Sequence, residues 1–429
     1  MVVIAHVSDT HLGHRPDDVR PGTIGQEVRP VEDDFYKALE MTVKEIVDRK
    51  DEIDLVIHSG DLFDSPWSYN PYPPPEMARK IVAKAFRDLQ SANIPIVIID
   101  GNHGRYVEYK HSTLDEYAIA FDNTRAFTYW SFRETFREKQ PLYADIKDEV
   151  RVYAFPYIEP STLETIGLYE EYQQWLKSIK LDKDKINIAI AHGSPIDGTL
   201  DQTILNMEFD YIALGHEHCM RRVTEKAWFS GSTERWKFDE KDHKKGFLIV
   251  QADKDKAPDI RQVHLTLPRP MVNETVQVQL DDSSHDIVKR IFNLLDNLGF
   301  RKPYDYETAA RVRIALEGEI SGRNVTQISE AIDYAYNKGL SDRNLNIIQL
   351  KIGRPPIKAS TLPPSISYVD IEYLIEDPAK DFKNYIEEKR KKNLIPKEYN
   401  LNLLTELFVE AMKKWRKSDE GFKAYRRTV

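Results

Sequence analysis

Residues 94–103 read IPIVIIDGNH, a continuous apolar run that ends abruptly on Asn102 and His103. Apolar side chains without polar alternation are typical of a central strand that is covered on both faces. Residues 55–61, LVIHSGD, repeat this pattern and end on Asp61. Because open α/β sheets place their ligand sites at the carboxyl ends of strands, we expect these polar residues to meet at one edge.

Three further apolar runs end in the same way, at residues 4–11 (IAHVSDTH), 186–193 (INIAIAHG) and 211–218 (YIALGHEH). The polar residues at the five strand ends are Asp9, His11, Asp61, Asn102, His103, His192, His216 and His218. A single histidine at a strand end is common. Eight ligand-type residues at five strand ends instead predict a metal centre in an α/β layered fold.

The spacing of these residues favours a hydrolytic site with two metal ions. Asp9 and His11 are two residues apart, so they point to the same side of an extended segment, and so do His216 and His218. The carboxylate of Asp61 has two oxygens and can bridge two ions about 3.5–4 Å apart. Mixed nitrogen and oxygen ligation suits Mn, Fe or Zn better than Mg or Ca, without distinguishing Mn from Zn.

His103 directly follows Asn102, and adjacent residues of an extended chain point to opposite sides. If Asn102 binds metal, His103 is free to act on the substrate. An imidazolium there can donate a proton to a leaving alkoxide near neutral pH. The alternative is a structural hydrogen bond that holds the loop.

The composition is that of a soluble protein with more than one domain. The chain has 429 residues, of which 41% are hydrophobic and 31% charged, and this length favours two or three cores. We expect neither a membrane span, which needs about 18 apolar residues, nor a secretory signal. The single Cys219 suits a reducing cytoplasm. The net charge of −9 is weak evidence against nucleic-acid binding, because the local field decides recognition.

The pattern of elements divides the chain into four parts. Residues 1–265 alternate strand-like and helix-like stretches, which predicts α/β layers. Residues 271–352 predict a small α+β domain. Residues 353–376 begin with four prolines within twelve residues, which predicts a stiff, extended linker. Residues 377–429 predict two basic helices, and we expect the apolar stripe of the second to dock on a partner rather than on the chain's own body.

The five motifs together resemble the calcineurin-like metallophosphoesterase superfamily. The resemblance implies a β-sandwich flanked by helices for residues 1–265. Residues 9–13 and 60–63, DTHLG and GDLF, look like the DNA double-strand-break repair nucleases of the SbcD and Mre-eleven type. Residues 229–236 and 245–247, FSGSTERW and KGF, are similar to the same family's Gly-Ser-x-Glu-Arg stretch and following strand.

The resemblance also implies a role for each candidate residue. Two Mn²⁺ ions per subunit would be bound, one by Asp9, His11, Asp61 and His218, and the other by Asp61, Asn102, His192 and His216. His103 would be the catalytic histidine. The family usually has an acidic residue directly after this histidine, whereas this chain has Gly104.

The function implied is a Mn-dependent DNA nuclease, with 3′-to-5′ exonuclease and single-strand endonuclease activity on DNA ends. A homodimer would form near helices at about residues 76–91 and 112–121, and the domain at 271–352 would cap the DNA. The C-terminal helices would bind an SMC-like coiled-coil ATPase of the SbcC type. The alternatives are a phosphatase or phosphodiesterase for small substrates, and a DNA-bridging scaffold with weak nuclease activity.

Overall fold

The computed structural model describes residues 1–16, 18–20, 28–29, 31–64, 73–103, 105–106, 111–321, 325–353, 357–358 and 386. Gly104 and almost all of the expected linker and C-terminal helices therefore lie outside the described residues. The chain forms two compact units. The first contains residues 1–276, 290–315 and 333–353, and the second contains residues 277–289, 316–332 and the chain from 354 onward. The expected division into four parts stays a prediction.

The first large sheet has six strands in the order β14-β13-β1-β2-β3-β6. The neighbours β1, β2, β3 and β6 run parallel, whereas β13 is antiparallel to β1 and β14 is antiparallel to β13. The strands are β1 (Val2–Val7), β2 (Leu55–His58), β3 (Ile96–Ile99), β6 (Thr124–Phe127), β13 (Gly246–Ala252) and β14 (Asp259–His264).

The second large sheet also has six strands, in the order β11-β12-β10-β9-β8-β7. Its four central strands are parallel, and the two edge strands are antiparallel to their neighbours. The strands are β7 (Tyr143–Ile146), β8 (Val150–Phe155), β9 (Ile186–His192), β10 (Tyr211–Gly215), β11 (Arg221–Arg222) and β12 (Ala227–Phe229).

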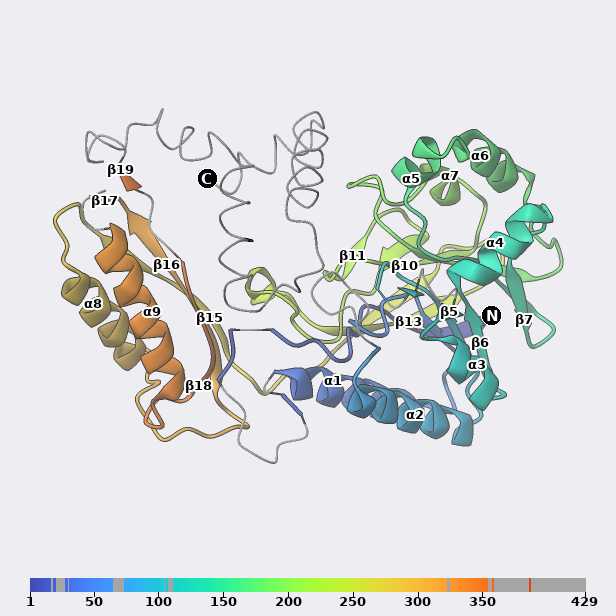
Figure 1. The fold of residues 1–429 in the computed structure, drawn as a ribbon. Helices are drawn as coiled ribbons and strands as arrows, with labels where there is room; N and C mark the ends of the chain where they lie inside the picture. The colour runs from blue at the N-terminus through green and yellow to red at the C-terminus, as the bar shows by residue number, and fades with distance from the viewer. Residues whose placement is uncertain are drawn as a thin grey trace. The chain divides into compact units, whose positions relative to one another are not determined.

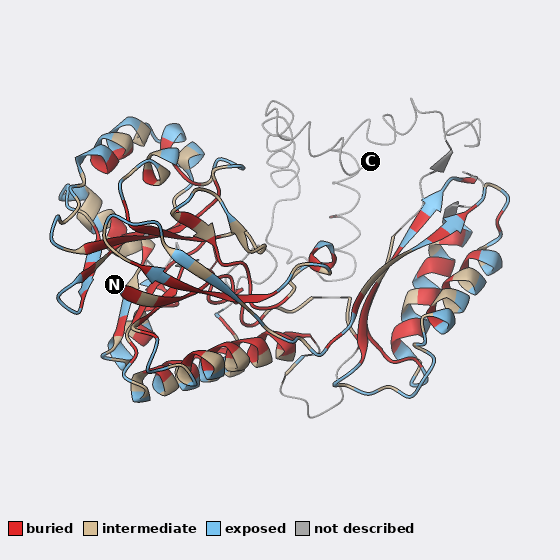
Figure 2. Cartoon of the chain, turned by 180° about the vertical axis from the view of Figure 1, so that it is seen from behind, coloured by how far each residue is buried: buried red, intermediate tan, exposed pale blue. Residues whose placement is uncertain are grey.

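The first sheet lies between the second sheet and a layer of helices (Figure 1). Side chains alternate between the two faces of a strand, so Val97 and Ile99 join the core shared with the second sheet, whereas Ile96 and Ile98 join the core beneath the helices. Helices α1 (Glu32–Val47), α2 (Glu76–Ser91) and α3 (Asp115–Ala120) contribute to the latter core. The inner strands β2, β3 and β9 are buried along their whole length (Figure 2). The expected sandwich flanked by helices is confirmed.

The outer face of the second sheet is covered by helices α4 (Tyr129–Arg137), α5 (Pro160–Thr165), α6 (Tyr169–Ser178) and α7 (Gln202–Leu205) (Figure 1). Phe132, Trp175 and Ile204 of these helices join the same core as the sheet. A short 3-10 helix, η1 (Phe238–Glu240), precedes β13.

A separate three-stranded sheet follows, in the order β15-β16-β18. Its elements are β15 (Met271–Val278), α8 (Ser284–Asn297), β16 (Ala310–Gly318), α9 (Val325–Ser341) and β18 (Ile347–Ile352). Two-residue strands form the pairs β4 (Arg105–Tyr106) with β5 (His111–Ser112) and β17 (Ile320–Ser321) with β19 (Ile357–Lys358). None of the helices described is both long and apolar enough to cross a membrane.

The parallel strands of both large sheets end toward the same edge of the sandwich. Strand β2 ends three residues before Asp61, β3 ends three residues before Asn102, and β9 ends on His192 itself. The turns that follow the strands must therefore pass close to one another. Gly60, with φ +107°, lies against His192, where an added Cβ would overlap the imidazole ring.

We expect Gly60→Ala to disturb His192 as well as the backbone. A non-glycine residue in the left-handed region costs about 1–2 kcal/mol, and the methyl group must also displace a buried ring. The matched control is Gly167→Ala, because Gly167 has φ +72° but nothing within 4 Å of an added Cβ. Urea unfolding should show the larger loss of stability for Gly60→Ala. Equal losses for the two variants would contradict the close approach.

Candidate metal centre

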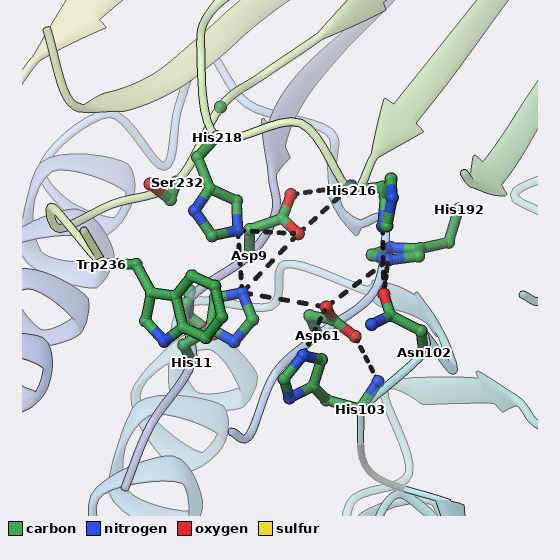
Figure 3. A network of polar contacts seen from close by, with 12 residues as sticks. Asp9, His11, Asp61, Asn102, His103, His192, His216, His218, Ser232 and Trp236 are labelled. Atoms are coloured by element: carbon green, nitrogen blue, oxygen red, sulfur yellow. Dashed lines mark hydrogen bonds and ion pairs between the residues drawn. The ribbon is translucent and has the colours of Figure 1, made fainter. Parts of the chain in front are cut away.

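All eight sequence-predicted residues come together at the edge where the two sheets meet (Figure 3). Asp61 lies in the middle of the group. Its Oδ2 is 3.5 Å from His192 Nε2 on one side and 3.8 Å from His11 Nε2 on the other. Its Oδ1 accepts a hydrogen bond of 2.9 Å from the backbone N–H of His103. The two oxygens of this one carboxylate therefore face separate parts of the site.

One group of donor atoms belongs to Asp9, His11 and His218, which lie close enough to share one metal ion. The Nε2 atoms of His11 and His218 are 3.0 Å apart. Asp9 Oδ1 lies 4.0 Å from His11 Nε2 and 3.9 Å from His218 Nε2. We call this set the first donor group.

The second donor group consists of Asn102, His192 and His216. The Oδ1 atom of Asn102 lies 3.0 Å from His192 Nε2 and 3.0 Å from His216 Nδ1. Asp9 joins the two groups, because its carboxylate accepts a hydrogen bond from the backbone N–H of His216. With Asp61 between them, the two groups offer two adjacent positions for cations.

Four of these residues have backbone conformations that L-amino acids rarely adopt. The φ angles are 50° for Asp9, 43° for His11, 54° for Asp61 and 101° for His216. Positive φ values are uncommon outside glycine, although Asp and His tolerate them better than most residues. Such strain gathers at functional sites where the surrounding structure enforces it. Here the strained turns direct the side chains of adjacent strands toward a common centre.

Each histidine of the two donor groups uses its second ring nitrogen to contact an oxygen outside them. This orients the ring and selects its tautomer. The contacts are His11 Nδ1 with Asp64 Oδ1 (3.1 Å), His218 Nδ1 with Glu240 Oε1 (2.9 Å), His192 Nδ1 with the Ser59 carbonyl (2.7 Å) and His216 Nε2 with Asp197 Oδ2 (3.1 Å).

These tautomers indicate that the site suits a cation. Because Asp64 and Glu240 accept hydrogen bonds from the Nδ1 atoms of His11 and His218, the neutral rings carry their hydrogens there. Their Nε2 lone pairs then face each other at 3.0 Å. Two lone pairs at that distance repel unless a proton or a metal ion lies between them. The mixed nitrogen and oxygen donors fit a divalent transition metal.

The carboxylates and histidines of the site shift each other's pKa values. Burial acts to raise the pKa of Asp61, but the neighbouring His192 and His103 outweigh burial and hold it well below its usual range. Burial acts to lower the pKa of His192, but Asp61 and Asp9 raise it to about 9. Two further histidines in the strands behave differently, since burial lowers the pKa of His6 to about 3 and that of His58 to about 4. His6 and His58 are therefore neutral packing residues.

His103 approaches the site from the side of Asp61 and away from Asn102, its sequence neighbour. Its Nδ1 lies 3.1 Å from the backbone carbonyl of Asp64 and 3.6 Å from the Asp64 carboxylate. Its Nε2 lies 4.0 Å from Asp61 Oδ2. The side chain is only 4% exposed, so it faces the interior of the site.

Several residues that shape the site were not predicted from the sequence. Asp64 follows Asp61 by three residues in the same turn, a spacing that could have indicated it. Glu240, by contrast, comes from η1 and has no motif. Trp236 stacks on His11, with ring centroids 5.2 Å apart and an interplanar angle of 16° (Figure 3). Tyr157 stacks on His216 at 6.1 Å and 29°.

The two-sheet sandwich and the buried carboxylates and imidazoles at its edge define a metal-dependent phosphoesterase. Comparison with protein families supports this assignment directly, because residues 2–220 match the model of the calcineurin-like phosphoesterase family. The chain belongs to this family. The expected phosphodiesterase class is confirmed.

Individual proteins with similar sequences indicate a narrower group within this family. The chain is 25% identical over 339 residues to the DNA double-strand break repair protein Mre11 of Thermoplasma acidophilum, which covers 77% of this chain and 81% of that protein. It is 27% identical over 263 residues to Mre11 of Methanocaldococcus jannaschii (58% and 62%) and 26% identical over 317 residues to Mre11 of Saccharolobus solfataricus (70% and 71%). The resemblance to this type of nuclease is confirmed.

We expect divalent metal to stabilise the protein, because the ion relieves the repulsion between the Nε2 lone pairs and is bound only by the folded chain. A ligand at 100 times its dissociation constant adds about 2.7 kcal/mol to the free energy of unfolding. Thermal melts with chelator and with metal measure this gain. Asp61→Asn should lose most of it, whereas the exposed Asp184→Asn should keep it. A melting temperature of the unmodified protein that is insensitive to metal would refute the metal centre.

Proposed function

We propose that this protein is a Mn²⁺-dependent nuclease that processes DNA double-strand breaks, with 3′-to-5′ exonuclease and single-strand endonuclease activity. Asp9, His11, Asp61 and His218 would hold one Mn²⁺, and Asp61, Asn102, His192 and His216 the other. The main support is the position of the Asp61 carboxylate between the two donor groups. The relatives named as break-repair proteins support DNA as the substrate.

Two divalent ions at such a site would supply Lewis acidity that activates a water nucleophile and neutralises charge on the attacking and leaving oxygens. The residues of the chain contribute orientation and proton transfer. The Asp64 carbonyl can only accept, so His103 Nδ1 keeps its hydrogen in both protonation states. Nε2 is then the atom that gains and loses a proton, and we assign it as the donor to the leaving oxygen.

Asp64 offers a physical reason why this chain can lack the usual acid after the catalytic histidine. Its backbone carbonyl contacts His103 Nδ1, and its carboxylate contacts His11 Nδ1. Asp64, in the turn that follows β2, therefore holds both His11, a candidate metal ligand, and His103, the candidate proton donor. Through hydrogen bonds from His11 and His14, the pKa of Asp64 stays below its usual range despite burial. The carboxylate is thus charged at neutral pH.

The remaining expectations concern partners and location. We propose a homodimer formed through α2 and α3, where Ile119 of α3 is 85% exposed. We also propose a capping role for residues 271–352. The C-terminal helices would bind an SMC-like ATPase of the SbcC type. This assembly would act on DNA ends in the cytoplasm, associated with the nucleoid if the host is prokaryotic.

His103→Ala should reduce Mn²⁺-dependent cleavage of DNA about 10²- to 10⁴-fold, the usual contribution of a general acid. Metal binding should persist, because the imidazole is outside both donor groups. Cleavage of labelled duplex and single-stranded DNA, together with metal titration, measures the two properties. The exposed His264→Ala serves as the control.

The same assays separate the alternatives. Unchanged cleavage by His103→Ala would remove His103 from the mechanism. Hydrolysis of small phosphodiesters without cleavage of DNA would favour a small-substrate enzyme. Binding of DNA and metal by the unmodified protein, without cleavage, would favour a scaffold.

A further inference from the structure

A buried lysine lies directly behind the first donor group. The Lys245 side chain is 1% exposed, and an unpaired ammonium at that depth would be strongly destabilising. Its Nζ donates to the backbone carbonyl of His218 at 2.8 Å, to Ser232 Oγ at 2.7 Å and to Glu240 Oε2 at 2.6 Å. All three ammonium hydrogens therefore have an acceptor.

Glu240 connects this lysine to the imidazole of the same histidine. Its Oε1 accepts a hydrogen bond from His218 Nδ1 at 2.9 Å. Its Oε2 accepts from Lys245 and also from the backbone N–H of Trp236, at 3.0 Å. Lys245 thus holds the main chain of His218 directly and the ring of His218 through Glu240.

Two other histidines of the site are oriented by acceptors of a different kind. His192 contacts the backbone carbonyl of Ser59, and His216 contacts the half-exposed Asp197. Residues 229–236 and 245–247, which in the sequence carry only a resemblance to a family, supply Ser232, Trp236 and Lys245. These stretches therefore have a physical task at the site.

We propose that Lys245 and Glu240 act together as a positioning pair that sets the metal affinity of the first donor group. The inference rests on the proposed role of His218 as a metal ligand. With Nδ1 held by Glu240 and the backbone held by Lys245, His218 Nε2 has one orientation, toward His11 and Asp9. Loss of Lys245 or Glu240 frees the His218 ring to rotate. The side chains of the second donor group keep their positions.

The test is calorimetric titration of the metal-free protein with Mn²⁺, using Lys245→Met, Glu240→Gln and the double variant. Each single variant should bind one of two ions about 10- to 100-fold more weakly, as is typical when an outer hydrogen-bond partner is lost. The other ion should bind as before. The double variant should bind this ion no more weakly than the single variant with the lower affinity, because the effects of mutating coupled residues are not additive. Lys244→Met is the control, since Lys244 is the exposed neighbour.

A second measurement covers the case in which Lys245→Met does not fold. Glu240→Gln keeps the shape of the side chain, and long-range ¹H–¹⁵N NMR of labelled histidines in the metal-free protein reports ring protonation. His218 should carry a hydrogen on Nδ1 in the unmodified protein and show a mixture of tautomers in Glu240→Gln. An unchanged His218 signal would overturn the proposal.

The outcomes distinguish this inference from the proposed function. If the unmodified protein binds fewer than two ions, the proposed two-metal function falls, and this inference falls with it. If it binds two ions and the variants do so with unchanged affinities, only the positioning pair is refuted. If the affinity for both ions falls equally and the melting temperature is also lower, Lys245 has a purely structural role. That result would also refute the proposed positioning pair.

Discussion

The two imidazole nitrogens that face each other at 3.0 Å, His11 Nε2 and His218 Nε2, impose the constraint on which the rest of the site depends. Their outer nitrogens are committed to Asp64 and Glu240, so their lone pairs point inward. Beside them lie the buried carboxylates of Asp9 and Asp61. An arrangement of lone pairs and negative charges in a desolvated place is unfavourable without a cation. The fold maintains it through two packed sheets and strained turns.

The turns explain how rigid strands can deliver such a set. Parallel strands bring their carboxyl ends to one edge, but the side chains still have to turn toward a single point. The positive φ angles at Asp9, His11, Asp61 and His216 provide that turn. Behind these donor residues, oxygens from Asp64, Glu240, Ser59 and Asp197 orient the imidazole rings. The site therefore has an inner layer of donor atoms and an outer layer that orients them, the arrangement that is typical of metal sites.

The buried strands and the inner donor residues could be predicted from the sequence because apolar runs and ligand-type residues are local signals. The run at 94–99 indicated a strand buried on both faces, and the polar residues after each run indicated a shared edge. The outer layer could not be predicted in the same way. Glu240 reaches His218 from a separate segment of the chain. No local sequence pattern around Lys245 indicates that its side chain is buried. Asp64 was visible in the motif, but its contacts depend on how the β2 turn folds.

The proposed nuclease site requires Asp61 to lie between two divalent ions. Crystals equilibrated with Mn²⁺ and measured with X-rays near the manganese absorption edge test it most directly, because anomalous scattering locates the ions independently of the protein. We expect two peaks about 3.5–4 Å apart, the separation typical of two-metal sites, with one Asp61 oxygen near both. A single peak, or two peaks of which only one lies near Asp61, would contradict it.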